Sequence, residues 1–114
     1  MTIHDHPTRR KELHQGYRDL GKVIPDQMKG FSDLHRAAVA DGALPKATKE
    51  LMAVAIAICT RCEDCLTLHM HDALKAGATP EMVHEAIGVA LLMGGGPAST
   101  YAARALEAFE QFSA

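Results

Sequence analysis

Apolar residues recur at helical spacing along most of the chain. In residues 8–20, Leu13, Tyr17 and Leu20 form a narrow apolar stripe in an otherwise charged stretch, and Gly21 follows as a stop signal. No segment sustains the alternation of apolar and polar residues that is typical of a half-buried strand. The pattern predicts an all-α protein. Its first helix buries little surface by itself, so we expect it to dock on the core or on a neighbouring subunit.

Two further helices begin at prolines. Pro25 begins a second helix that ends near Gly42. Its apolar face is predicted to be buried and consists of Met28, Phe31, Leu34, His35, Ala38 and Val39. Pro45 begins a third helix, which is apolar on every side from residue 51 to residue 58. A helix that is apolar all round is typical of a central, fully buried element.

Glycines separate the last three helices. A fourth helix is predicted over residues 62–75 and ends before Gly77, and Pro80 begins a fifth. The glycines at residues 94–96 predict a tight corner, because they lack the Gly-Lys-Ser/Thr sequence of a phosphate-binding loop. Pro97 then begins a sixth helix. The chain is therefore expected to form about six helices.

The composition fits one small domain, residues 1–114, in which residues 1–24 form an N-terminal helical extension. Apolar residues make up 47% of the chain and the formal net charge is −2, which argues against disorder and against a surface for nucleic acid. The chain contains no Trp, three Phe and two Tyr, so an aromatic platform for stacking bases is also not expected.

No targeting or membrane segment is expected. Residues 1–6 are polar, which argues against a signal peptide. The longest apolar run, residues 51–59, is far shorter than the ~20 residues that a membrane span needs. The three cysteines are an odd number. This count fits a cytoplasmic protein with a reactive pair and one spare thiol better than a secreted disulfide scaffold.

The candidate chemistry lies in residues 50–69. Cys62 and Cys65 form a C-x-x-C pair, His69 follows Cys65 by four residues, and Glu50 precedes the apolar run. If a helix begins at Cys62, both thiols and the imidazole fall on one helix face. Backbone N–H groups at a helix N-terminus lower the pKa of a thiol, and a second thiol nearby can capture a sulfenic acid as a disulfide. These four residues are the predicted catalytic residues.

Other interpretations of the same residues are open. The cysteines could be buried and inert, Glu50 could form an ordinary ion pair, or Cys62, Cys65, His69 and Glu50 could bind zinc. Ligands along one helix suit tetrahedral zinc poorly, and an iron–sulfur cluster at Cys59, Cys62 and Cys65 would lack a fourth cysteine. We therefore expect no metal and no cofactor.

The remaining histidines are not expected to take part in chemistry. We interpret the scattered His4, His6 and His14 as solvated residues. His35 lies with the apolar stripe of the second helix and is interpreted as a packed or edge histidine. His71 points away from the thiol face and is interpreted as a surface residue.

The spacing of the four candidate residues resembles a known family. Glu50, Cys62, Cys65 and His69 match the E-x11-C-x-x-C-x3-H pattern of AhpD-like alkylhydroperoxidases, in the carboxymuconolactone decarboxylase superfamily. The match continues through residues 77–81 and 93–98, and it covers about residues 30–110. The resemblance implies an AhpD-like helical fold with a central antiparallel helix pair, and assembly as a homo-oligomer, a trimer or hexamer.

The resemblance also implies an activity, namely thiol-dependent reduction of hydroperoxides or disulfide exchange. Cys65 would attack the peroxide and Cys62 would resolve the sulfenic acid, while Glu50 and His69 would relay protons. The implied partners are a hydroperoxide substrate and a dithiol or protein-disulfide reductant. Asp64 stands where the resembling proteins can carry a histidine, and its charge opposes the helix-end effect on the thiols.

Two alternative functions remain. Members that resemble the decarboxylase work without a redox cysteine pair, so the presence of Cys62 and Cys65 argues against decarboxylation. A non-catalytic oligomeric binding or scaffold protein could also carry the motif.

Overall fold

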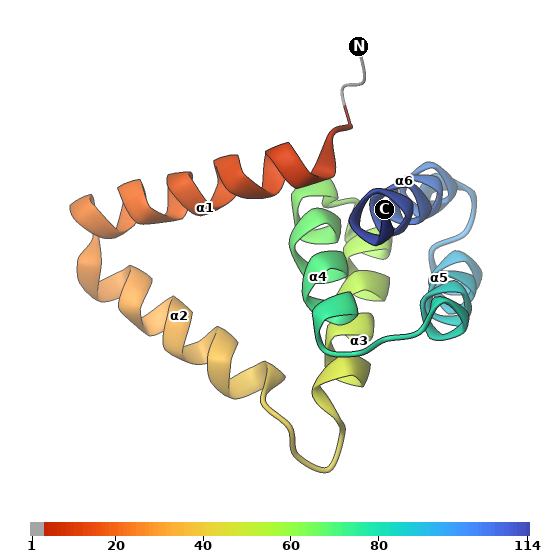
Figure 1. Cartoon of the computed structure of the whole chain (residues 1–114), viewed down its shortest axis with the longest axis horizontal. Coiled ribbons are helices and arrows are strands. Elements are labelled where there is room, and N and C mark those ends of the chain that lie inside the picture. Colours follow the sequence, from red (N-terminus) through yellow and green to blue (C-terminus); the bar gives the residue numbers. More distant parts are fainter. Residues whose placement is uncertain (1–3) are drawn as a thin grey trace.

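A computed structural model describes residues 4–114, which form six α-helices and no strand. The helices are α1 (His6–Val23), α2 (Pro25–Val39), α3 (Lys46–Thr60), α4 (Glu63–Lys75), α5 (Pro80–Gly94) and α6 (Gly96–Ser113) (Figure 1). The all-α prediction is confirmed. The sequence predicts no signal peptide in the polar residues 1–6. Residues 1–3 of that stretch lie outside the described residues. None of the described helices is long and apolar enough to cross a membrane.

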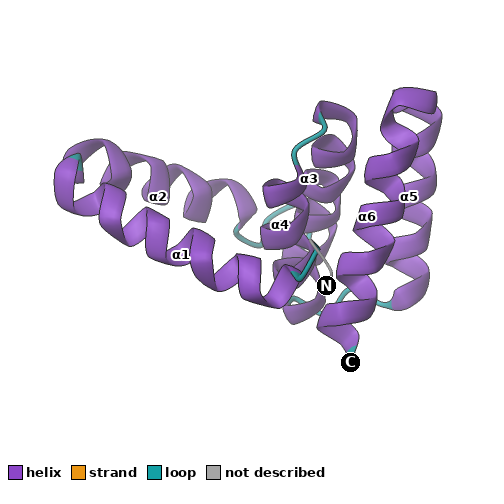
Figure 2. Cartoon of the chain, turned by 90° about the horizontal axis from the view of Figure 1, so that it is seen from above, coloured by secondary structure: helices purple, strands orange, loops and turns teal. Residues whose placement is uncertain are grey.

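Helices α3 to α6 form a packed four-helix unit. α3 and α4 run antiparallel beside each other, and α5 and α6 pack against them as a second antiparallel pair (Figures 1 and 2). The largest apolar side chains of the core are fully buried: Val54, Ile58, Leu66, Met70 and Val83. α6 contributes a stripe of buried alanines, Ala98, Ala102, Ala105 and Ala108, whose small side chains let the helices approach closely.

Helices α1 and α2 form a hairpin that extends away from this unit (Figure 2). No residue of α2 is buried, and Phe31 and Leu34 are 55% and 64% exposed. The prediction that the second helix has a buried face is therefore wrong for the single chain. Among residues 4–114, most of its apolar stripe is left uncovered, because the hairpin diverges from α3 and α4 instead of packing along them.

The third helix is buried on one side only. Leu51, Val54 and Ile58 lie in the core, but Met52 and Ile56 are exposed. The prediction of a fully buried element is thus correct for the face toward α4 and α5 and wrong for the opposite face. An apolar sequence pattern cannot distinguish a face buried within the chain from an exposed apolar face.

Two helix ends differ from the prediction. α1 continues through Gly21 to Val23, since one interior glycine costs only about 1 kcal/mol. Its C-cap is Ile24, which precedes Pro25, and a residue before proline is disfavoured in the helical conformation. α2 ends at Val39 rather than near Gly42. The ammonium of Lys49 donates to the carbonyl of Ala40 at 2.7 Å and so stabilises this earlier helix end.

His6 anchors the start of α1 to the four-helix unit. Its Nδ1 lies 2.7 Å from the hydroxyl of Thr67 on α4, and its Nε2 lies 3.2 Å from a carboxylate oxygen of Glu107 on α6. Its backbone N–H donates to Gln111 at 2.8 Å. The interpretation of His6 as solvated is wrong, because the ring is buried between two helices that are distant from it in sequence.

Candidate functional site

The cysteine pair lies where α3 ends and α4 begins. Arg61 caps α3 in the left-handed conformation, with φ of 57°, and the N–H of Cys62 donates to the carbonyl of Ala57 at 3.0 Å. A non-glycine residue costs roughly 1–2 kcal/mol in this conformation. Cys62 is then the N-cap of α4, whose first helical residue is Glu63, one residue later than predicted. The sharp turn at Arg61 thus places the first cysteine at the positive end of α4.

Cys62 and Cys65 form a disulfide, with their Cα atoms 5.3 Å apart. The sulfur of Cys62 also accepts a hydrogen bond from the backbone N–H of Cys65 at 3.2 Å. Both residues are half-buried. When the bond is reduced, the same N–H and the helix end favour a thiolate on Cys62. The third cysteine, Cys59, is a free thiol packed against the core, and it donates to the carbonyl of Ala90.

Arginines from two other helices pair with the acidic residues between the cysteines. Arg104 on α6 donates to Glu63 at 2.9 Å. Arg9 on α1 makes two hydrogen bonds of 2.9 Å to Asp64. These bonds lower the pKa of the Asp64 carboxyl, although burial acts in the opposite direction. The negative charge expected to oppose thiolate formation is therefore partly balanced by a neighbouring guanidinium.

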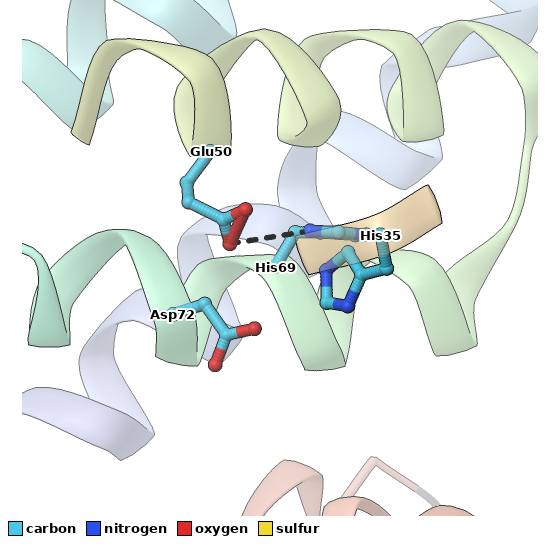
Figure 3. Close-up of side chains that lie close together, drawn as sticks. All are labelled: His35, Glu50, His69 and Asp72. Atoms are coloured by element: carbon cyan, nitrogen blue, oxygen red, sulfur yellow. Dashed lines mark hydrogen bonds and ion pairs between the residues drawn. The ribbon is translucent and has the colours of Figure 1, made fainter. Parts of the chain in front are cut away.

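Glu50 and His69 meet across the α3–α4 pair. Oε2 of Glu50 and Nδ1 of His69 are 3.3 Å apart (Figure 3). A carboxylate can only accept, so Nδ1 carries the hydrogen and Nε2 is left as the basic nitrogen. The hydrogen bond to Glu50 raises the pKa of His69, and burial partly opposes this. His69 lies one helical turn after Cys65, a spacing at which Cβ atoms are about 5–6 Å apart. The structure thus places the disulfide at the start of α4 and the Glu50–His69 pair one helical turn after Cys65.

The buried carboxylate of Glu50 is only half satisfied. The residue is fully buried, and its Oε1 has no hydrogen-bond partner among residues 4–114. Burial of an unpartnered polar atom is unfavourable by several kcal/mol in apolar surroundings. Glu50 is therefore a buried carboxylate paired with His69, not an ordinary ion pair at the protein surface.

A cavity of about 520 Å³ lies between the α1–α2 hairpin and α4. Its wall includes Tyr17, Phe31, His35, His69 and Asp72, and neither Cys62 nor Cys65 lines it. A smaller polar hollow of about 260 Å³ includes the two residues that flank Cys62 in the chain. The large cavity is therefore lined by His69, and the polar hollow lies beside the chain segment that carries Cys62.

Two residues that the sequence analysis did not assign to the site lie beside His69. The ring of His35 on α2 packs edge-on against the ring of His69, with centroids 5.6 Å apart. Asp72 follows His69 by three residues and lies on the same side of α4 (Figure 3). The i, i+3 spacing of His69 and Asp72 is visible in the sequence. Nothing local indicates that His35 joins them, because α2 and α4 are separate elements.

Comparisons with known proteins agree with this architecture. A protein of the carboxymuconolactone decarboxylase family from Legionella pneumophila is 44% identical, with a TM-score of 0.92 over 96% of this chain and 97% of that chain. A Thermotoga maritima protein of the same family, described as a candidate for involvement in antioxidative response, is 32% identical. Its TM-score is 0.71, over 76% of this chain and 90% of that one.

A sequence relative and a family model extend the agreement. An uncharacterized protein of Cupriavidus necator is 40% identical over 110 residues, which are 96% of this chain and 97% of that protein. The model described as "Carboxymuconolactone decarboxylase family" matches residues 25–108. With these matches and the six-helix fold, the chain belongs to the carboxymuconolactone decarboxylase family.

Proposed function

We propose that the protein is a thiol-dependent peroxidase and disulfide oxidoreductase. The observation that carries the proposal is the Cys62–Cys65 disulfide at the N-terminus of α4, one helical turn from the Glu50–His69 pair. A redox-active pair needs two sulfurs in bonding reach and a nearby group that accepts a proton. The antioxidative role suggested for the Thermotoga maritima relative supports the same activity.

The reaction uses the reduced pair and a hydroperoxide. His69, held by Glu50, accepts the proton of the Cys65 thiol, and the thiolate attacks the terminal peroxide oxygen. The O–O bond breaks, Cys65 becomes a sulfenic acid, and the leaving alkoxide takes a proton to form an alcohol. The thiolate of Cys62 then attacks the Cys65 sulfur, which forms the disulfide and releases water. An external dithiol returns two electrons and two protons by exchange at Cys62.

The two cysteines differ in position, and this difference supports different roles. Cys65 packs against the core one turn before His69, where a general base can act on it. Cys62 is the N-cap, beside the polar hollow that includes Arg61 and Arg104. A bulky disulfide partner can approach the N-cap of a helix more easily than a position inside the first turn. We therefore assign peroxide attack to Cys65 and exchange to Cys62.

Mass spectrometry of single variants after one equivalent of peroxide, with dimedone present, tests these roles. Cys65→Ser should not react, whereas Cys62→Ser should react once and give a dimedone adduct on Cys65. Cys59→Ser is the matched control and should behave as wild type, because its thiol is packed against the core. An adduct on Cys62 in Cys65→Ser, with none on Cys65 in Cys62→Ser, would reverse the assignment.

The proton relay has its own test. Glu50→Gln and His69→Ala should slow sulfenic acid formation by roughly 10²–10⁴-fold, the usual contribution of a general base. His84→Ala is the control, since His84 is exposed on α5. Unchanged rates in both relay variants would remove the relay from the mechanism while leaving the dithiol chemistry intact.

Peroxide turnover with a dithiol reductant, combined with counting of free thiols, separates this proposal from the other functions. Loss of two thiols per chain with turnover supports the peroxidase. Intact thiols after peroxide would instead favour a decarboxylase-like enzyme or a binding protein. The cycle also requires a compartment that keeps dithiols reduced, which is why we assign the protein to the cytoplasm.

We also propose that the protein works as a homo-oligomer, a trimer or hexamer. Large apolar side chains are exposed on α5, where Leu92 and Met93 are 79% and 76% exposed, and Ile56 on α3 is exposed as well. Contiguous exposed apolar surface on a monomer usually marks an interface. Light scattering should give a mass several times the 12.3 kDa of one chain. A monomer at micromolar concentration would contradict this.

A further inference from the structure

A cluster of four potential metal ligands lies at the inner end of the large cavity. His35 comes from α2, Glu50 from α3, and His69 and Asp72 from α4 (Figure 3). Each offers one ligand atom, and these four atoms all lie within 4.8 Å of one another. Three consecutive helices thus bring two imidazoles and two carboxylates close together.

A second, independent observation points to a cation at this place. Glu50 is fully buried, and its Oε1 has no partner in the described part of the chain. The carboxylate points from α3 toward His69 and Asp72 on α4 (Figure 3). A bound cation would supply the contact that this oxygen lacks, because carboxylate oxygens are common ligands of divalent ions.

One ligand pair is already spaced as in a coordination shell, and all four ligand atoms lie within 4.8 Å of one another. With metal–ligand bonds of about 2.0–2.2 Å, neighbouring ligands of a tetrahedral site are about 3.4 Å apart. Nδ1 of His69 and Oε2 of Glu50 are already 3.3 Å apart. His35 is exposed and Asp72 is half-buried, so both can move the short remaining distance by side-chain rotation. One oxygen of Asp72 also lies 3.0 Å from Nδ1 of His71, which leaves its other oxygen for the ion.

We infer that His35, Glu50, His69 and Asp72 form a binding site for a divalent transition-metal ion of the zinc class, and that the bound ion inhibits the peroxidase. The inhibitory part rests on the proposed function. The ion binds Nδ1 of His69, so the neutral imidazole carries its hydrogen on Nε2 and can no longer receive the proton of Cys65. Mixed imidazole and carboxylate ligands favour Zn²⁺ over Mg²⁺, which avoids nitrogen ligands.

This inference departs from the sequence-based expectation of no metal, and it uses different ligands from the zinc site considered there. That site required both cysteines, which bond to each other in the disulfide and cannot bind an ion in that state. The cluster described here needs neither sulfur. A bound ion would also join α2 to the four-helix unit through His35, which lies near the C-terminal end of that helix.

Zinc binding to the full-length protein in its disulfide form tests the site without interference from the thiol pair. After chelator treatment and dialysis, calorimetric titration with Zn²⁺ should show one ion per chain, and Mg²⁺ should give no binding. His35→Gln and Asp72→Asn should each weaken binding at least about tenfold. His84→Gln is the matched control and should bind zinc as wild type does, because the side chain of His84 is exposed on α5.

Three results would contradict the proposed site. The wild-type protein could bind no stoichiometric zinc, or His35→Gln and Asp72→Asn could both keep the wild-type zinc affinity. The control His84→Gln could also lose as much zinc affinity as those two variants. Circular dichroism of each variant checks that the helices persist, and His35 is exposed, so its replacement removes no core packing. A Zn²⁺-dependent rise in Tm that is absent from His35→Gln provides a second readout independent of activity.

Inhibition is tested by the ratio of sulfenic acid formation rates with and without Zn²⁺ within each protein. The ratio should fall at least about tenfold in wild type and His84→Gln and stay near one in His35→Gln. Equal inhibition of His35→Gln would mean that zinc acts on the thiols, which would overturn the regulatory claim. If the zinc-free protein does not react with peroxide, the proposed function fails, while the calorimetry still decides the metal site.

Discussion

The four-helix unit and the α1–α2 hairpin satisfy the same kind of amphipathic pattern in different ways. In α3–α6, the apolar faces meet one another, and residues such as Ile58 and Met70 are fully buried. In the hairpin, His6 is the only buried residue among those described, and the apolar stripe of α2 remains exposed. An amphipathic pattern therefore predicts that a helix has an apolar face, but not whether that face is covered by its own chain.

The hairpin nevertheless contributes to the site. Arg9 of α1 pairs with Asp64 beside the cysteines, and His35 of α2 packs against His69. These are contacts of polar side chains, which can form and break without loss of a core. Elements with few buried contacts open at low free-energy cost. The four-helix unit thus supplies the rigid part of the site, and the hairpin supplies residues that can adjust it.

The largest difference between the regions should appear on truncation of apolar side chains. Ile58→Ala should lower the free energy of unfolding by about 2–5 kcal/mol, because it leaves a cavity in a fully packed core. Leu34→Ala should change it by about 0.5 kcal/mol or less, as for other exposed positions. Chemical denaturation measures both values. A loss in Leu34→Ala comparable to that of Ile58→Ala would show that another subunit covers the hairpin.

The anchor at His6 should have an intermediate effect. His6→Ala should lower stability by about 1–3 kcal/mol, since it removes a buried ring and leaves the polar partners on α4 and α6 without it. His84→Ala serves as the exposed control. Hydrogen exchange should show faster exchange of α1 amides with little change in α3. Uniform acceleration in both helices would mean that the hairpin and the four-helix unit unfold together.

Glycine-to-alanine substitutions should change stability in opposite directions in the two regions. A Cβ at Gly94 would lie 2.5 Å from the Cβ of Ala98 and 3.3 Å from the sulfur of Cys59, so Gly94→Ala should destabilise by about 1–3 kcal/mol. A Cβ at Gly30, in the middle of α2, would have no neighbour within 4 Å outside the adjacent helix backbone, so Gly30→Ala should stabilise by about 0.4–1 kcal/mol. Thermal unfolding of both variants gives the comparison. Destabilisation by Gly30→Ala would indicate a close neighbour on that face in an assembly.

The smallest effect is expected from the ion pair that joins the hairpin to the cysteines. Arg9→Gln leaves the charge of Asp64 unbalanced, which should slow thiolate formation by about two- to fivefold, because an exposed pair contributes little. Arg9→Lys keeps the charge and should recover most of the rate. Stopped-flow measurement of sulfenic acid formation distinguishes the variants. Identical rates in all three proteins would show that the hairpin has no electrostatic influence on the thiols.

Local signals in the sequence were sufficient for most of the fold. Pro25 and Pro80 mark helix starts correctly, because a ring that fixes φ and lacks an N–H suits the first helical turn. The cysteine pair was predicted at the start of a helix, and it lies there within one residue. Gly21 misled the prediction, since a glycine ends a helix only where the backbone must become left-handed, and here the chain turns at Ile24.

The sequence alone determined most of each helix and the C-x-x-C motif, because these depend on short-range spacing. The contact between Glu50 and His69, 19 residues apart on two helices, came only from the tertiary structure. Only the tertiary structure showed that Arg9 balances Asp64, that His6 is buried, and that His35 and Asp72 join the site. The physical reason is the same in each case. Contacts between side chains far apart in sequence depend on how the helices cross. Those crossing angles result from packing of the whole core, which no single segment encodes.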